Sequence, residues 1–193
     1  MSNITTYLDF GYDPINLPNA VASTGNAEAE KIAQFIAQYE PEYLKKILGF
    51  TLYELLIANI GDNGTYDALV EGDTFTDTFG NVRKWEGFTV KNNPIACYIY
   101  YKYQESNASN TYGVGESVAD VENGKRVSPR NKMMTAWNKM VDFNSVLHDY
   151  LYAKRTLFPS YIGLNYPPYG YIDKYAPDYI NQYQELFIKL SWL

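Results

Sequence analysis

The stretch Asn93–Gln104, NPIACYIYYKYQ, is the most informative about the fold. It places four tyrosines between residues 98 and 103. Aromatic residues favour strands, but Asn93 is a good helix cap and Pro94 suits the first helical position. The sequence therefore predicts a helix over residues 94–105. A helix that is apolar nearly all round is buried on more than one face.

The tyrosines of this helix allow two interpretations. An unpaired buried hydroxyl costs about 1–3 kcal/mol, so each ring is expected to reach a hydrogen-bond partner. Rings with a polar tip suit a surface that is exposed in the single chain and covered after assembly. They also suit a core helix whose tyrosine tips reach water. The sequence leaves both open.

Composition favours one domain, or one domain with an appendage. The chain has 193 residues, of which 46% are hydrophobic and 20% are charged, so it can form a core. It contains no apolar run of the roughly 20 residues that a membrane helix needs. The start, MSNITTYLDFGYDP, lacks the features of a secretory signal. The single cysteine, Cys97, fits a reducing compartment.

The net charge of −6 argues against a dedicated nucleic-acid binder. Its distribution is uneven. Residues 1–90 hold thirteen acidic and five basic side chains, whereas residues 91–193 hold nine acidic and eleven basic ones. Such a split lets an acidic region of one copy meet a basic region of another, or it solvates two faces of one chain.

Three short helices are expected between residues 26 and 60. Asn26 caps the first, and the pair Glu40-Pro41 is expected to end it, because proline disfavours helix at the residue before it. The second ends at Gly49. The third, Leu52–Ile60, ends at a GDNG turn.

A β-hairpin and a long helix complete the predicted core. Residues 71–88 alternate polar and apolar side chains around a Gly80-Asn81 turn, which is typical of a hairpin. Ser128-Pro129 is expected to begin a helix over residues 129–154. Its apolar stripe consists of Met133, Trp137, Met140, Leu147 and Leu151, with Asn144 in the middle.

The fold class expected from these patterns is mainly α, a helical bundle with one small β-hairpin. Residues 1–25 are predicted to form an extended N-terminal arm, and residues 26–157 the helical core with a long loop over 106–130. Residues 158–193 are expected to form a Tyr/Pro-rich extension with a short terminal helix, because proline prevents regular helix over most of this segment.

The sequence indicates no catalytic, cofactor or metal site. Cys97 and the only histidine, His148, lack the local signature of a nucleophile–base pair, and no phosphate-binding loop is present. One histidine and one cysteine leave few soft ligands for a metal. The acid pairs considered for a hydrolase are Glu40 with Glu42 and Asp142 with Asp149.

A basic cluster, GKRVSPRNK, precedes and enters the long helix. It holds Arg126 and Arg130 between Lys125 and Lys132. The cluster suits contact with an acidic protein surface or a passing phosphate backbone, and it equally suits a solvated helix entrance.

Several segments in order resemble proteins of tailed phages and prophages of gut Bacteroidales. They are AEKIAQFIAQYEPEYLKKILGFTLYELL, KWEGF, NNPIACYIYYKYQ, a polar loop with VGES and ENG, and AWNKMVDFN. The match spans about residues 24–150 and leaves the tail uncovered. The proteins concerned are head-to-tail connector, or neck ring, components, including those of crAss-like phages. The chain departs from the simplest connectors by its hairpin, long loop and tail.

This resemblance implies a non-enzymatic structural subunit of a virion, assembled in the host cytoplasm. About twelve copies would form a ring that binds the portal protein and other neck proteins, with DNA passing through without tight binding and with no membrane contact. A surface or glycan-binding module using exposed tyrosines is the alternative, and a carboxylate-based hydrolase is third. The residues expected at interfaces are Tyr98, Tyr100, Tyr101, Arg126, Arg130, Tyr161, Tyr166, Tyr169 and Tyr171.

Overall fold

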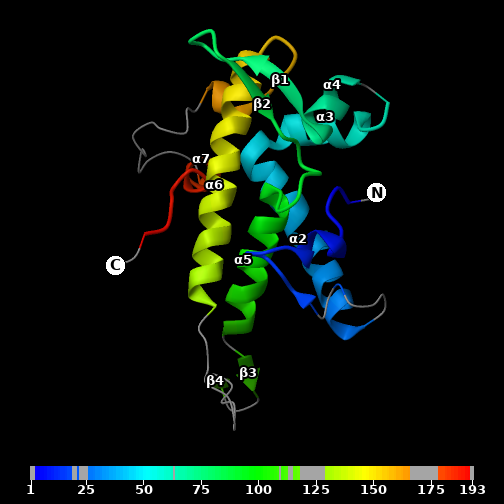
Figure 1. Ribbon diagram of the computed structural model, residues 1–193, viewed down its shortest axis with the longest axis vertical. Coiled ribbons are helices and arrows are strands. Elements are labelled where there is room, and N and C mark those ends of the chain that lie inside the picture. The colour runs from blue at the N-terminus through cyan, green and yellow to red at the C-terminus, as the bar shows by residue number, and fades with distance from the viewer. Residues whose placement is uncertain are drawn as a thin grey trace.

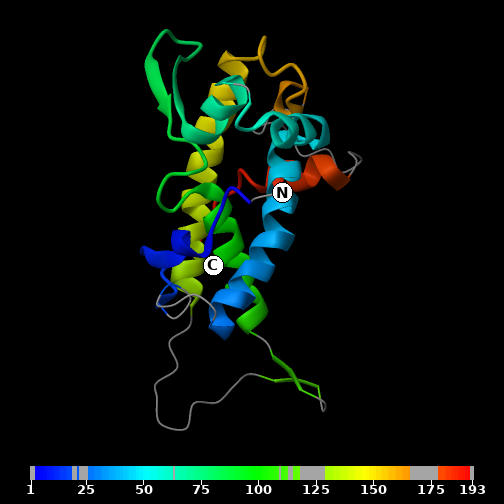
Figure 2. The ribbon, with the colours of Figure 1, turned by 90° about the vertical axis from the view of Figure 1, so that its right-hand side faces the viewer.

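Three long helices form the body of the protein in the computed structural model (Figure 1). They are α2 (Ala27–Leu48), α5 (Pro94–Ala108) and α6 (Arg130–Ala153). Helix α5 lies between the other two and runs antiparallel to both, as Figures 1 and 2 show from two sides. The structure describes residues 3–18, 21, 26–62, 64–108, 110–112, 115–117, 129–165 and 178–191.

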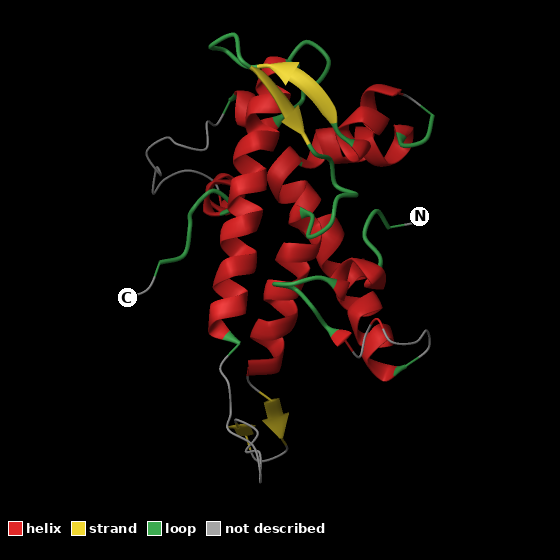
Figure 3. Ribbon diagram, in the orientation of Figure 1, coloured by secondary structure: helices red, strands yellow, loops and turns green. Residues whose placement is uncertain are grey.

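Shorter elements surround this body, and two hairpins lie at its opposite ends (Figure 3). The β1–β2 hairpin sits over the C-terminal end of α6, and the β3–β4 pair lies beyond the opposite end of the bundle. The predicted mainly α fold with one small hairpin is confirmed, whereas the β3–β4 pair was not predicted. The shorter elements are η1 (Tyr7–Gly11), α3 (Phe50–Asn59), α4 (Gly64–Glu71), β1 (Asp73–Thr76), β2 (Val82–Trp85), β3 (Asn110–Tyr112), β4 (Gly115–Ser117), η2 (Ile162–Leu164) and α7 (Asp178–Glu185).

Helix α5 begins where the sequence predicts it. The side chain of Asn93 accepts a hydrogen bond from the backbone N–H of Ala96 at 2.8 Å, and Pro94 is the first helical residue. Every residue from Ile95 to Tyr100 is at most 2% exposed, so the helix is buried on more than one face as expected. Six consecutive buried positions leave no solvent-facing stripe in this part of α5.

Helix α2 is longer than predicted. It continues through Pro41 and ends only at Gly49, so the break expected at Glu40-Pro41 is wrong. Proline within a helix costs about 3 kcal/mol because it cannot donate to the preceding turn. Burial of Tyr43 and Leu44, both 0% exposed, directly after the proline offsets that cost, since each such side chain contributes about 1.5–3 kcal/mol.

The hairpin predicted over residues 71–88 is confirmed as β1–β2. Its register pairs Asp73 with Trp85 and Thr76 with Val82, which leaves a five-residue loop. Trp85 is fully buried and donates from its indole N–H to the Leu69 carbonyl at 2.7 Å. This bond holds the hairpin to α4, a helix that the sequence patterns did not predict.

Helix α6 follows its predicted range, and the polar residue in its apolar stripe joins three segments. Asn144 is fully buried, accepts a hydrogen bond from the Tyr43 hydroxyl, and donates to the Leu186 carbonyl at 2.7 Å. Because all its bonds are internal, Asn144 fixes the positions of α2 and the segment after α7 relative to α6.

The described parts of the N-terminal arm and C-terminal extension belong to the same core as the bundle. Phe10 and Ile15 of the arm are fully buried, and so are Tyr161 and Tyr183 of the extension. Gly163 lies so close to these tyrosines that an added Cβ would be 2.4 Å from the Tyr183 hydroxyl. The close approach requires glycine, and it packs η2 directly against α7.

Candidate functional site

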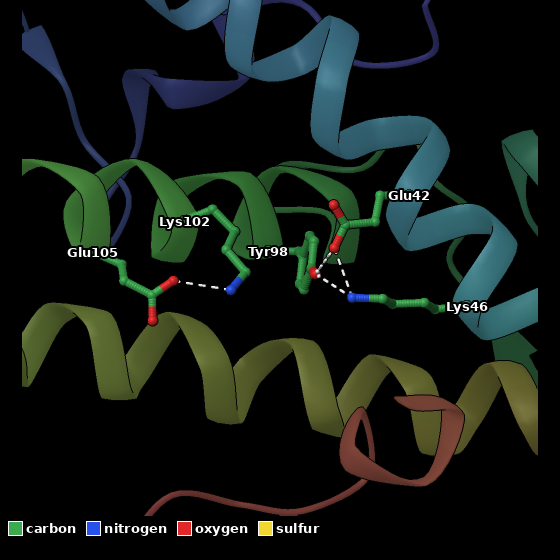
Figure 4. Close-up of polar contacts among 5 residues, drawn as sticks. All are labelled: Glu42, Lys46, Tyr98, Lys102 and Glu105. Carbon is green, nitrogen blue, oxygen red and sulfur yellow. Dashed lines mark hydrogen bonds and ion pairs between the residues drawn. The ribbon is translucent and has the colours of Figure 1, made fainter. Parts of the chain in front are cut away.

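Tyr98 of α5 forms a polar cluster with Glu42 and Lys46 of α2 (Figure 4). The Tyr98 hydroxyl donates to the Glu42 carboxylate at 2.7 Å, and the Lys46 ammonium lies 2.6 Å from the same oxygen and 3.1 Å from the hydroxyl. Lys102 pairs with Glu105 at 2.9 Å along α5. The tip of Tyr98 is thus satisfied within the chain.

Burial and hydrogen bonding shift the pKa values of Tyr98 and Glu42. Burial raises the pKa of Tyr98 well above its usual value, and the hydrogen bond to Glu42 raises it further. Burial alone would raise the pKa of Glu42, but hydrogen bonds from Lys46 and Tyr98 outweigh it and hold that pKa below its usual value. At neutral pH the Tyr98 phenol is therefore neutral and the Glu42 carboxyl is ionised.

The rings of this cluster occupy the interface between α5 and its two neighbours. The Tyr98 ring is 2% exposed, with its centroid 5.3 Å from that of Tyr43 on α2 and 6.3 Å from that of Trp137 on α6. Tyr103 is 5% exposed and donates to Glu28 at 2.8 Å. The pKa of Tyr103 is raised to about 12, mainly by burial and further by the hydrogen bond to Glu28.

A second buried cluster attaches the C-terminal extension to α6. The Tyr161 hydroxyl lies 3.1 Å from Nδ1 of His148 and 3.0 Å from the Tyr183 hydroxyl. Burial lowers the pKa of His148, and the nearby charge of Asp149 opposes that effect. The imidazole is thus favoured in its neutral form, which accepts or donates a hydrogen bond within the cluster.

These contacts correct part of the expected interface. Tyr98, Tyr100 and Tyr161 are at most 2% exposed in the single chain, so they are core residues and not rings that wait for a neighbour. The hydroxyls of Tyr98 and Tyr161 bond inside the fold, so these tips do not reach water as the core interpretation expected. Tyr101 is half-buried, with its ring 4.8 Å from that of Trp137, and Arg130 is exposed at the start of α6.

Four of the residues expected at interfaces lie outside the described part of the chain. They are Arg126, Tyr166, Tyr169 and Tyr171.

The four carboxylates considered for hydrolysis all have other partners. Glu40, 4% exposed, accepts hydrogen bonds from the backbone N–H groups of Ile4 and Thr5, each at 2.8 Å. Burial raises the pKa of Glu40, and these two bonds oppose the rise. Glu42 belongs to the Tyr98 cluster described above. Asp142 pairs with Lys189 at 2.6 Å, and Asp149 pairs with Arg83 of β2.

Cys97 and His148 also have separate partners. The buried thiol of Cys97 donates to the Asn92 carbonyl at 3.3 Å, whereas His148 contacts the tyrosines of the extension. Burial raises the pKa of Cys97 to about 12, so the thiol is not ionised at neutral pH.

The tip of the β1–β2 hairpin, residues 77–82, exposes apolar side chains that the sequence analysis did not single out. Phe79 is 89% exposed and Val82 is 79% exposed. The Asp77 carboxylate accepts hydrogen bonds from the backbone N–H groups of Phe79 and Asn81, both at 2.9 Å, which shape the loop. Phenylalanine in a five-residue turn was the available signal, since turns favour small and polar residues.

A groove lies where the end of α2, the start of α3, η2 and α7 meet. This junction groove has a volume of about 520 Å³, and its apolar lining includes Phe50 and Ile162. Gly49 lines the groove with φ near +85°, and an added Cβ would lie 3.1 Å from Ile162. Lys45 stands at the groove with its ammonium 4.9 Å from the Tyr53 ring centroid. No sequence pattern indicated this groove, because it joins residues more than 100 positions apart.

Within the described residues, no group of three or more histidine, cysteine or acidic side chains is placed to hold a metal ion. The same part of the chain contains no helix with the length and apolar character needed to cross a bilayer. No protein-family model matches the chain, and neither does any curated protein or solved structure.

Proposed function

We propose that this chain is a structural subunit of a phage neck, in which a ring of copies connects the portal to the tail. The observation that carries the proposal is the position of the two hairpins at opposite ends of a long helical body (Figure 1). A subunit stacked between two other rings needs contacts at both ends of its long axis. The sequence resemblance to connector proteins over residues 24–150 supports the same assignment.

The distribution of exposed and buried side chains supports a role in assembly. The tyrosines of α5 stabilise the body, whereas exposed apolar residues are present on the hairpin tip and on α3, where Phe50 is 66% exposed. Exposed apolar surface beside charged residues is typical of protein-binding surfaces. Copies of this chain and neighbouring rings are the proposed partners, and the virion neck is the proposed location.

Particle analysis tests this function. Mass spectrometry of purified tailed particles is expected to detect the chain at a copy number equal or close to that of the portal. Cryo-electron microscopy of the same particles is expected to place its helical body around the exit channel. Absence of the chain from intact, DNA-filled particles would refute the proposal.

A further inference from the structure

We infer that the hairpin tip of one copy inserts into the junction groove of the next copy, forming a head-to-tail contact. The inference rests on the proposed function for its biological setting, although the contact itself is argued from the surfaces alone. It names the two unlike patches that a ring requires. A ring forms when one patch binds a different patch on the neighbour and the rotation closes.

The two surfaces lie on opposite sides of one end of the molecule. In Figure 2 the β1–β2 hairpin is at the upper left, while the α2–α3 junction, η2 and α7 are at the upper right. A copy placed beside another in the same orientation therefore presents its hairpin towards the groove side of its neighbour. The same step repeated adds further copies. Each copy then uses its hairpin to bind one neighbour and its groove to bind the other.

The shapes and polarities of the surfaces match. The tip offers Phe79 and Val82, which are the two most exposed large apolar side chains of the described residues. The groove offers an apolar lining of Phe50 and Ile162 and has room for an aromatic side chain with part of its loop. Insertion would remove both apolar surfaces from water, at about 25 cal/mol per Å² buried.

The charges of the two surfaces are also complementary, because Lys46 and Glu42 in the groove lining pair with each other and leave the charge of Lys45. Lys45 makes two cation–π contacts, with Phe50 at 5.9 Å and Tyr53 at 4.9 Å, and has no carboxylate partner among the described residues. Asp77 stands two residues from Phe79 in the tip loop. A backbone hydrogen bond from Asn81 is the main cause that holds the pKa of Asp77 below its usual value, so the tip carries a negative charge at neutral pH. A tip bound in the groove brings this charge near Lys45.

The hairpin is held firmly enough to act as an insert. Arg83 of β2 pairs with Asp149 of α6, and the Phe75 ring packs edge-on against Tyr150 at 5.6 Å. Trp85 fixes the base of the hairpin by its bond to Leu69. The strands are fixed to the body, and the Asp77 hydrogen bonds shape the loop between them. Little conformational entropy is therefore lost when the tip binds.

Cysteine cross-linking tests the contact directly. The full chain carrying both Phe79→Cys and Thr51→Cys, where Thr51 is an exposed groove residue, is expected to form a ladder of disulfide-linked oligomers under mild oxidation. A mixture of the two single variants is expected to give dimers that contain one of each. The matched control pairs Thr51→Cys with Leu8→Cys, since Leu8 is 55% exposed on η1, and it is expected to give no ladder.

A second measurement uses variants without cysteine. Phe79→Ser and Lys45→Glu are each expected to weaken self-association at least about tenfold in sedimentation velocity, whereas Leu8→Ser leaves it unchanged. Circular dichroism checks that each variant is folded. The contact is refuted if the wild-type chain stays monomeric at high concentration, or if the wild-type chain assembles but the variant with Phe79→Cys and Thr51→Cys forms no ladder. In the latter case detection of the chain in particles would still support the proposed function, so the two failures are distinguishable.

Discussion

The carboxylate of Glu40 joins the N-terminal arm to α2 through two backbone hydrogen bonds, to Ile4 and Thr5. Glu40→Gln keeps the size of the side chain but replaces one acceptor oxygen with an NH2 group that faces an N–H donor. We expect this change to lower the free energy of unfolding by about 1–3 kcal/mol, because one buried N–H loses its acceptor. Urea denaturation at neutral pH measures it.

A matched control for this experiment is Glu54→Gln on α3. Glu54 is exposed, so its substitution is expected to change stability by less than about 0.5 kcal/mol. An equal loss in both variants would show that the arm bonds contribute nothing specific.

His148 gives the protein a pH-dependent stability. Its pKa is lowered in the folded state by burial, so the unfolded chain binds a proton more readily than the folded one. The stability that this histidine contributes is fully present above its unfolded pKa of about 6.5. It is lost as the pH falls from there through the lower folded pKa, by up to about 1.4 kcal/mol per pH unit.

The variant His148→Gln isolates this effect, since glutamine retains hydrogen-bonding groups but does not titrate. We expect urea denaturation between about pH 7.5 and pH 5 to show a steeper loss of stability in the wild-type chain than in the variant. The charges that face the imidazole include Asp149, which pairs with Arg83 and is present in both chains. Parallel pH profiles would contradict the expectation.

Among the elements, those with a strong local start signal could be predicted from the sequence. Asn26 and Asn93 accept the hydrogen bonds that a cap residue makes, at 2.7 and 2.8 Å, and the helices after them begin as expected. Helix α4 has no such signal. It begins at Gly64, the last residue of the turn-forming GDNG sequence, and its position depends on burial of Leu69 and Val70 beneath the hairpin. That contact is tertiary and cannot be read from local preferences.

Helix α2 continues through Pro41 because tertiary packing outweighs the helix-breaking effect of proline. Pro41 lies in the interior of the helix, where it cannot donate to the carbonyl of Ala37. Pro41→Ala restores a donor and improves helix propensity, so we expect the free energy of unfolding to rise by about 1–3 kcal/mol. The urea midpoint measures this, and the exposed α3 substitution Thr51→Ala is the comparison. A loss of stability would indicate that the core requires a bend at Pro41.

At the scale of the molecule, the sequence could predict that the α5 tyrosines need partners but not which partners they have. Tyr98 bonds to Glu42, and Tyr103 bonds to Glu28, across 56 and 75 positions of sequence. Such pairs depend on how α2 and α5 pack, which no local pattern encodes. The junction groove and the hairpin tip escaped prediction for the same reason, since a surface is defined by which segments the fold brings together.

The charge arrangement of the whole molecule bears on its proposed place around a DNA channel. Many of its basic side chains pair with carboxylates, and the net charge of the chain is −6. The seven ion pairs of the described residues are Lys46–Glu42, Arg83–Asp149, Lys84–Glu86, Lys102–Glu105, Lys132–Asp13, Lys154–Asp73 and Lys189–Asp142. A paired cation gains little by releasing counterions from a phosphate backbone, and a net negative protein repels one.

We therefore expect the purified chain to bind duplex DNA no more tightly than the weak non-specific range of about 10⁻⁴ M at physiological salt. Fluorescence anisotropy of a labelled duplex measures this, with the salt concentration varied. The variant Arg126→Glu/Arg130→Glu removes two cations of the basic cluster and is expected to bind no differently if that cluster contacts protein. Submicromolar affinity that falls steeply with salt, and that this variant abolishes, would instead assign the cluster to DNA and contradict a channel through which DNA passes unhindered.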